Sequence, residues 1–257
     1  MPTPATHARI NRTLDDLQAV VRPSKWSYRK RLLQLIHEAG LHWRSADYGA
    51  GYLYQSYPRL GLRGFRKTDF RMAQMDLQNE LSGKSVLEIG CNSGFLSLEL
   101  VQGASRYVAF DNNPYLIEIA RITQEEIGCN GVEFRVDTFE AFPLGQTFDV
   151  VLSFANHSTW DGNMTLVLEA YFAKVQRLLV PQGMLLFESH HPALEDEHKV
   201  LETIKVMQKF FALEETRLLT KGSAWDRGRT FVKARSLLTS GPGTDVRHGS
   251  HEGDRLS

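Results

Sequence analysis

Histidines gather in two short segments of this chain. His157 lies in the segment AlaAsnHisSerThrTrp of residues 155–160, and His190 lies in the segment GluSerHisHisPro of residues 188–192. Imidazole titrates near neutral pH, so either side chain could act as a general base that takes a proton from a hydroxyl. We take His157 as the first candidate and His190 as the second. The alternative for His157 is a loop histidine that bonds a backbone carbonyl.

The second histidine segment allows another kind of chemistry. Glu188, His190 and His191 could contribute to a divalent metal site that polarises an acceptor. They fall in one short loop, however, and lack the helical ligand spacing of a strong metal motif. Cys91 and Cys129 are too few for a disulfide scaffold or a cysteine-rich metal site. We therefore expect no metal.

The elements that must position these histidines begin with residues 86–100, VLEIGCNSGFLSLEL. The apolar run at its start is typical of a buried parallel strand, and the leucines at its end begin an amphipathic helix. Gly90 and Gly94 in the turn between them let the backbone approach a nucleoside ligand closely. A nicotinamide-type fingerprint would need glycine at 90, 92 and 95, and the residues Asn92 and Phe95 exclude it. Glycines that serve packing alone are the alternative.

The pattern Glu88-x-Gly90-x-Asn92-x-Gly94 resembles motif I of the class I S-adenosylmethionine-dependent methyltransferases. The usual form of that motif is acidic-x-Gly-x-Gly-x-Gly, from which Asn92 departs. Asparagine tolerates left-handed backbone angles, so the departure weakens the match only slightly.

Two further strand ends resemble the second and third cofactor motifs of this family. Asp111 ends a strand about 20 residues beyond the turn, where a ribose diol would be bound. Asp137 ends a third strand and precedes Phe139, a pair suited to the adenine amine and ring face. Each aspartate alone could instead be a loop-start cap. The resemblance implies S-adenosyl-L-methionine as the cofactor. The contacts that it implies are those of Glu88, Gly90, Asn92, Gly94, Phe95, Asp111, Asn112, Asp137, Thr138, Phe139 and Ser153.

The rest of the core alternates as a doubly wound α/β fold should. Its expected elements are strands at 148–154 and 184–188, helices at 165–179 and 195–211, and late strands near 211–220 and 229–238 with a turn between them. The resemblance implies a Rossmann-like seven-stranded sheet in the order 3-2-1-4-5-7-6, with helices on both faces and a closing antiparallel hairpin. Ligands of such sheets lie beyond the carboxyl ends of the strands, so both histidine segments should face the cofactor.

We divide the chain into three parts. They are an N-terminal helical extension and lid over 1–75, an S-adenosylmethionine-binding core over 76–240, and a flexible C-terminal tail over 241–257. In the first part we expect disorder over 1–13, then a helix stopped by Pro23, and a second helix from Lys25 that ends at Gly40.

The end of the N-terminal part, residues 49–71, is dense in Tyr, Gly and Arg. This composition is typical of a loop that closes over a polar ligand and not of a core element. Guanidinium groups bind carboxylates and phosphates, so Arg63, Arg66 and Arg71 could bind the carboxylate of the cofactor or an anionic substrate. The tyrosines Tyr52, Tyr54 and Tyr57 could line the same pocket or pack under the loop.

Composition is ordinary for a soluble globular protein, with 257 residues, 42% hydrophobic and 23% charged. The opening lacks the apolar region of a secretory signal and no run is long enough to span a bilayer, so we expect a cytoplasmic protein without membrane contact. The net charge is zero, but basic residues are concentrated in 1–75 and acidic residues in 76–220. Either the N-terminal part meets an anionic partner or it docks on the acidic core.

The resemblance implies an enzyme that transfers a methyl group to an oxygen or nitrogen of a small polar acceptor, such as an anionic molecule, a sugar or a natural-product intermediate. The first alternative is an RNA-modifying methyl- or carboxymethyltransferase, because the region from Gly64 through the motif I helix is similar to the tRNA wobble-uridine carboxymethyltransferases. Against RNA, the chain has neither an appended recognition module nor an overall positive charge. The second alternative is a non-catalytic module that keeps the cofactor pocket.

Overall fold

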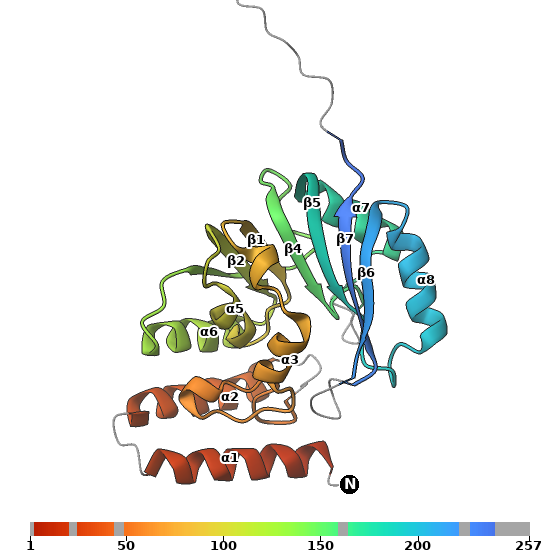
Figure 1. The fold of residues 1–257 in the computed structure, drawn as a ribbon. Helices are drawn as coiled ribbons and strands as arrows, with labels where there is room; N and C mark the ends of the chain where they lie inside the picture. The colour runs from red at the N-terminus through yellow and green to blue at the C-terminus, as the bar shows by residue number, and fades with distance from the viewer. Residues whose placement is uncertain (1–2, 21–24, 44–48, 159–163, 221–226, 240–257) are drawn as a thin grey trace, which may run out of the picture.

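A seven-stranded sheet forms the centre of the protein, with helices on both of its faces (Figure 1). The computed structural model describes residues 3–20, 25–43, 49–158, 164–220 and 227–239. Its strand order is β3-β2-β1-β4-β5-β7-β6, so the fold class predicted from the sequence is confirmed. The expected tail over 241–257 and most of the turn between the last two strands lie outside the described residues.

The strands of the sheet closely follow the apolar runs of the sequence. They are β1 Ser85–Ile89, β2 Arg106–Asp111, β3 Val132–Val136, β4 Phe148–Phe154, β5 Leu179–Glu188, β6 Phe211–Leu219 and β7 Arg229–Ser236. Strands β1 to β5 pair in parallel with one another, and β7 runs antiparallel to both β5 and β6. The prediction for β5 was too short, because buried Leu179 already pairs with Phe148 of β4. Pro181 is tolerated where that pairing changes register.

Two apolar cores lie on opposite faces of the sheet. Adjacent side chains of a strand point to opposite faces, so Val86 packs in one core and Leu87 in the other. Helices α5 Phe95–Leu100 and α6 Pro114–Glu126 cover the first face. Helices α7 Leu168–Arg177 and α8 Glu197–Met207 cover the second. This layering leaves the carboxyl ends of the parallel strands open at one edge.

The N-terminal part is helical from Pro4. Helix α1 spans Pro4–Val20, so the expectation of disorder was wrong for the described residues of 1–13, and the helix expected before Pro23 forms the later part of α1. Its polar sequence forms a helix because tertiary contacts stabilise it, notably through the buried side chains of Ala8 and Asp15. Helix α2 spans Trp26–His42 and packs on α6, and it passes through Gly40, where an end was expected.

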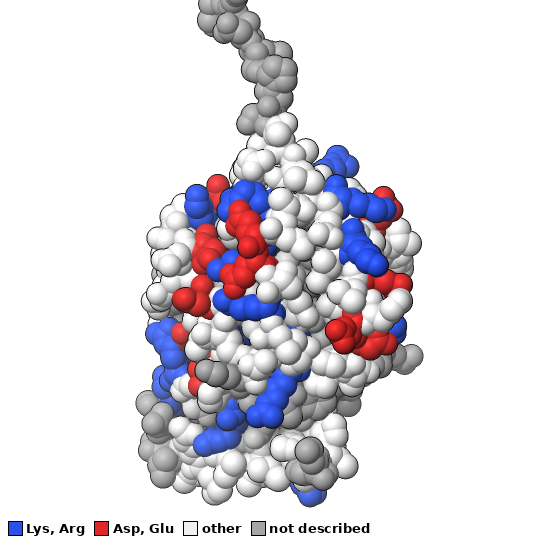
Figure 2. Space-filling model, turned by 45° about the vertical axis from the view of Figure 1, so that its right-hand side comes forward, with Lys and Arg blue, Asp and Glu red and all other residues white. Residues whose placement is uncertain are grey.

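Ion pairs join the basic N-terminal part to the acidic core. Lys25 contacts Glu126 at 2.5 Å, and Arg31 contacts Glu125 at 3.1 Å. These contacts favour docking as the explanation of the uneven charge. On the face drawn in Figure 2, acidic and basic side chains lie next to one another across the upper half.

The segment from residue 49 to helix α3 Thr68–Met75 packs against the core, in contrast to the expectation that it is not a core element. Its Tyr52, Leu53, Tyr57, Leu62 and Phe65 are all buried. Isolated bridges join Gln55 to Arg66 and Tyr57 to Leu62, around the short 3-10 helix η2 Pro58–Leu60.

Two short helices lead from that segment to the sheet, α3 Thr68–Met75 and α4 Gln78–Leu81. In the described part of the chain, no helix is long and apolar enough to cross a membrane.

Candidate functional site

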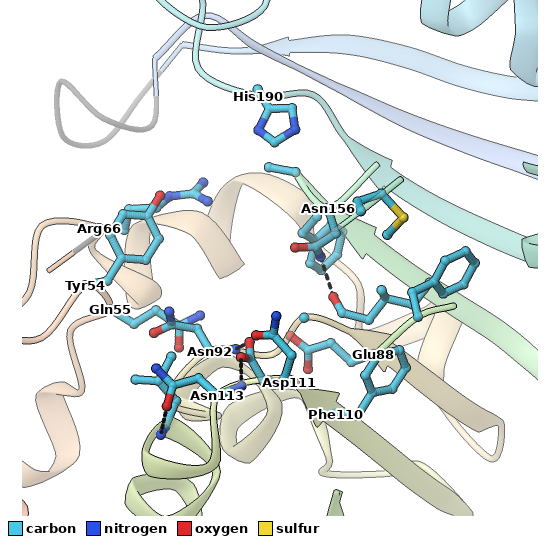
Figure 3. A pocket seen from close by; sticks show the side chains of 18 of the residues that line it. Tyr54, Gln55, Arg66, Glu88, Asn92, Phe110, Asp111, Asn113, Asn156 and His190 are labelled. Carbon is cyan, nitrogen blue, oxygen red and sulfur yellow. Dashed lines mark hydrogen bonds between the residues drawn. The ribbon is translucent and has the colours of Figure 1, made fainter. Parts of the chain in front are cut away.

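A cavity of about 500 Å³ opens at the carboxyl ends of the parallel strands (Figure 3). This is the edge where an open α/β sheet binds its ligands. Most of the residues that line the cavity come from the ends of β1 to β5 and the loops that follow them, and others come from the segment before α3, from α3 itself and from the start of β7. They include Tyr54, Gln55, Phe65, Arg66, Arg71, Glu88, Gly90, Asn92, Phe110, Asp111, Asn112, Asn113, Asp137, Thr138, Phe139, Phe154, Asn156, His190, His191 and Arg229.

The turn after β1 brings the backbone against the cavity. Gly90 has a φ of +64°, and a Cβ added there would lie 2.5 Å from Oδ1 of Asn156. The Asn156 amide in turn donates to the carbonyl of Ile89. Asn92 also takes a positive φ of 55°, as its residue type allows. The missing Cβ of Gly90 thus makes room for Asn156, and Gly90 and Asn92 both line the cavity.

Gly94 meets a different requirement. Its φ is +68°, and an added Cβ would lie 2.6 Å from Cβ of Ala120 on α6 and 2.6 Å from the ring of Phe134 on β3. Gly94 does not line the cavity. It allows the start of α5 to pack closely on its neighbours.

The Asp111 carboxylate is fixed at the end of β2 by two backbone amides. It accepts hydrogen bonds from the N–H of Asn92 at 2.9 Å and of Asn113 at 3.0 Å. The side chain of Asn113 caps α6 by accepting from the amides of Tyr115 and Leu116. A carboxylate held in this way can accept hydrogen bonds from a pair of hydroxyl groups.

The loop after β3 adds an acid and an aromatic ring to the cavity wall. The N–H of Asp137 donates to the Asp111 carbonyl at 3.0 Å, which joins this loop to the end of β2. Oδ1 of Asp137 accepts from the N–H of Thr138 at 2.8 Å. Phe139 is buried, with its ring centroid 4.5 Å from that of Tyr171.

Glu88 at the end of β1 lines the cavity while its carboxylate is held from the protein side. It accepts hydrogen bonds from the hydroxyls of Ser97 at 2.6 Å and Tyr107 at 2.8 Å. Burial raises the pKa of this carboxyl group, and the two hydroxyls oppose that change.

Besides Gly94, three other residues expected to contact the cofactor do not line this cavity. The ring of Phe95 is buried in the core and stacks on Tyr57, and Ser153 lies 2.8 Å from the Tyr171 hydroxyl within the other core. Arg63 pairs with Asp15 of α1 at 2.6 Å. The cofactor contacts expected of Phe95, Ser153 and Arg63 do not fit these positions, because each side chain contacts another residue away from the cavity.

Arginines form one wall of the cavity around a single buried carboxylate. Glu188, at the end of β5, contacts Arg66 at 2.6 Å, Arg71 at 2.6 Å and Arg229 at 3.4 Å. All four side chains are buried. The three guanidinium groups lower the pKa of Glu188 to about 2 against the effect of burial. Arg229 was missed in the sequence, because nothing local marks the first residue of a hairpin strand as part of a distant site.

This arrangement does not fit the metal site considered from the sequence. The Glu188 carboxylate is already paired with three arginines, so it is not available to bind a metal ion together with His190 and His191. Across the described ranges, no group of three His, Cys, Asp or Glu side chains could hold a metal ion.

The two candidate bases occupy different environments. His157 is buried and does not line the cavity, and its Nε2 lies 3.0 Å from the Glu195 carboxylate. His190 does line the cavity, and its Nε2 forms a hydrogen bond of 3.1 Å with the Ser158 hydroxyl. Burial first, and then the charge of His157, lower the pKa of His190 to about 4. The geometry therefore favours His190, the second candidate, over His157.

Gln55 is a further residue that the sequence analysis missed. Its side chain accepts from the N–H of Phe95 at 3.2 Å and donates to the Cys91 carbonyl at 3.4 Å. It thereby joins the segment before α3 to the turn after β1. No motif in the sequence marks this long-range pairing.

A family model described as a methyltransferase domain matches residues 80–233. A ubiquinone biosynthesis O-methyltransferase from Pseudomonas fluorescens (strain Pf0-1) is 31% identical over 123 residues, 46% of this chain and 50% of that protein. A probable protein arginine N-methyltransferase 6.2 from Oryza sativa subsp. indica is 24% identical over 188 residues, 67% of this chain and 46% of that protein. The chain thus spans about half the length of these curated relatives.

Solved structures with the same fold include the N-methyltransferase NodS from Bradyrhizobium japonicum WM9 in complex with S-adenosyl-L-homocysteine. It aligns with a TM-score of 0.54 and 18% identity, over 66% of this chain and 88% of that chain. A putative S-adenosylmethionine-dependent methyltransferase from Listeria monocytogenes aligns with a TM-score of 0.53 and 14% identity, over 66% and 99% of the two chains. At these identities, the likeness establishes a shared fold.

Proposed function

This chain belongs to the family of class I S-adenosylmethionine-dependent methyltransferases, and on that premise we propose that it methylates an oxygen or nitrogen atom of a small polar acceptor. One observation carries the proposal. The cavity joins a nucleoside-type site at the ends of β1, β2 and β3 to a histidine and an arginine wall beyond β4 and β5.

The cofactor half of the cavity is assigned as follows. Asp111 binds the ribose hydroxyls, because two backbone amides hold its carboxylate at the rim. Asp137 and Thr138 face the adenine amine, and Phe139 lies against the ring. The backbone of Gly90 and Asn92 approaches the methionine part, because both residues line the cavity. When bound, S-adenosylmethionine supplies an electrophilic methyl group on a sulfonium.

The protein's contribution to the reaction is position and proton removal. The loops after β4 and β5 orient the acceptor, so that its nucleophilic atom lies in line with the transferred methyl group. His190 accepts the proton of the acceptor at Nε2, directly or through the Ser158 hydroxyl that this atom bonds. Its low pKa keeps the imidazole neutral at pH 7, the form that can take a proton.

The acceptor class is an anionic small molecule. Arg66, Arg71 and Arg229 all line the cavity and share the Glu188 carboxylate, which holds the guanidinium groups in place. Guanidinium groups positioned in advance suit a carboxylate or phosphate on the acceptor. Lys25 and Arg31 form ion pairs with α6, so contacts within the protein account for part of the positive charge of the N-terminal part. A nucleic-acid partner is not required to explain that charge.

The test is an assay of S-adenosylhomocysteine release with defined acceptors. The panel contains hydroxylated aromatic carboxylates, phosphorylated sugars, the neutral counterparts of both, and bulk tRNA. We expect turnover with an anionic small molecule and at least tenfold less with its neutral counterpart. Turnover with tRNA alone, or equal turnover of each charged and neutral pair, would contradict the assignment of the acceptor class.

A further inference from the structure

Glu195 connects the two histidine segments beneath the cavity. One oxygen of its carboxylate accepts from Nε2 of His157 at 3.0 Å and from the Thr203 hydroxyl at 2.9 Å. The other accepts from the backbone N–H of His190 at 2.8 Å. The loop after β4, the loop after β5 and helix α8 are thus joined at one buried carboxylate, whose pKa is lowered to about 2.

The ring of His157 lies directly against that of His190. The two ring centroids are 4.6 Å apart, and the ring of Phe187 lies 4.9 Å from that of His157. Nδ1 of His157 is buried and has no hydrogen-bond partner among the described residues. This imidazole is therefore anchored at Nε2 alone, with its ring packed between Phe187 and His190.

We propose that His157, anchored by Glu195, is a positioning residue that packs against the His190 imidazole and keeps it in the neutral, proton-accepting form. The inference rests on the proposed function, in which His190 is the base. It gives a role to the residue that the sequence first suggested as the base. It also explains how the buried carboxylate of Glu195 can lie next to His190, whose ring must remain uncharged.

The charged groups that face His190 determine whether its imidazole is neutral or protonated. Glu195 favours the protonated imidazole, whereas His157 and Arg229 disfavour it. Arg229 reaches this region from β7, where its guanidinium donates to the Ser189 carbonyl at 3.2 Å. His157 thus offsets the influence of Glu195 on its neighbour, so that Glu195 can hold the His190 backbone without charging the ring.

The proposal is tested by NMR titration of histidine side chains in the full-length, isotopically labelled protein. His190→Gln assigns the His190 signal. In the unaltered protein, we expect the His190 midpoint to lie below pH 5. In His157→Gln, which can still donate to Glu195 but does not titrate, we expect it to rise by about one pH unit or more. If the glutamine variant does not fold, His157→Phe serves in its place, because it keeps a ring between Phe187 and His190. We expect the His190 midpoint to rise in this variant as well.

The matched control is His198→Gln, which removes an exposed histidine from α8 and should leave the His190 midpoint unchanged. An unchanged midpoint in both folded His157 variants would overturn the proposal and leave His157 with a packing role alone. Because the midpoint is measured without any acceptor, this outcome is separate from failure of the proposed function. That failure would appear as full turnover in His190→Gln.

Discussion

The backbone N–H of Asn92 donates to the Asp111 carboxylate at 2.9 Å, and this bond joins the turn after β1 to the end of β2. The two residues belong to separate motifs, 19 positions apart in the sequence. Their contact fixes the turn after β1 against the end of β2 at the rim of the cavity. Asn92 can take this position because it adopts a φ of 55°, which asparagine tolerates and β-branched residues do not.

Replacement of Asp111 by alanine should weaken the binding of S-adenosylhomocysteine by about 10- to 100-fold, since a charged acceptor of hydrogen bonds is lost. Isothermal titration calorimetry measures the change. Asp149→Asn is the matched control, because that carboxylate bonds Ser85 at the opposite end of the sheet. Equal affinity in the Asp111 variant and the unaltered protein would rule out the proposed ribose contact.

Gly94→Ala should destabilise the fold by several kcal/mol, on the order of 1–2 for its positive φ and 1–3 for crowding against Ala120 and Phe134. Gly83→Ala is the control, since its φ is +69° but an added Cβ meets nothing within 4 Å. Urea unfolding of the two variants separates the backbone cost from the packing cost. Equal losses of stability would show that Gly94 is not needed for packing.

Ser153→Ala should leave the affinity for S-adenosylhomocysteine unchanged and reduce the free energy of unfolding by about 1–3 kcal/mol. The expected loss follows from the Tyr171 hydroxyl, which bonds Ser153 and is buried with it. Calorimetry and urea unfolding provide the two measurements. A marked loss of affinity would restore Ser153 as a cofactor ligand and contradict its position in the structure.

Stability should fall in two steps as the pH is lowered. The pKa of His190 is lowered from 6.5 to about 4 in the folded state, so its contribution is complete above pH 6.5 and is lost as the pH falls toward 4. This step is on the order of 2–3 kcal/mol. Glu188, with a pKa lowered from 4.5 to about 2, adds a loss below pH 4.5. Urea unfolding between pH 8 and 4 should show the first step, and His190→Gln should remove it.

The strands and the position of two aspartates at their ends, beside the cavity, could be predicted because their signals are local. A strand buried on both faces is a run of apolar residues, and Asp111 and Asp137 each follow such a run directly. The order of all seven strands followed from the family resemblance. Only the later part of helix α1 was predicted, and its start was missed, because the stability of the helix depends on contacts such as that between Asp15 and Arg63, 48 positions away.

The catalytic side of the cavity was harder to predict from the sequence. The segments of His157 and His190 look alike, and only the tertiary packing of Glu195 turns one histidine into the interior and leaves the other at the cavity. Arg229 reaches Glu188 across 41 positions of sequence, with no motif at either residue. Such contacts depend on the register of the closing hairpin, which local patterns do not encode.

The central claim is that this cavity binds S-adenosylmethionine, and calorimetric titration of the purified protein with S-adenosylmethionine and S-adenosylhomocysteine tests it most directly. We predict micromolar dissociation constants for both ligands, corresponding to about −8 kcal/mol, and no binding of NAD in the same experiment. Absence of binding by both sulfur ligands, or binding of NAD in their place, would contradict the account.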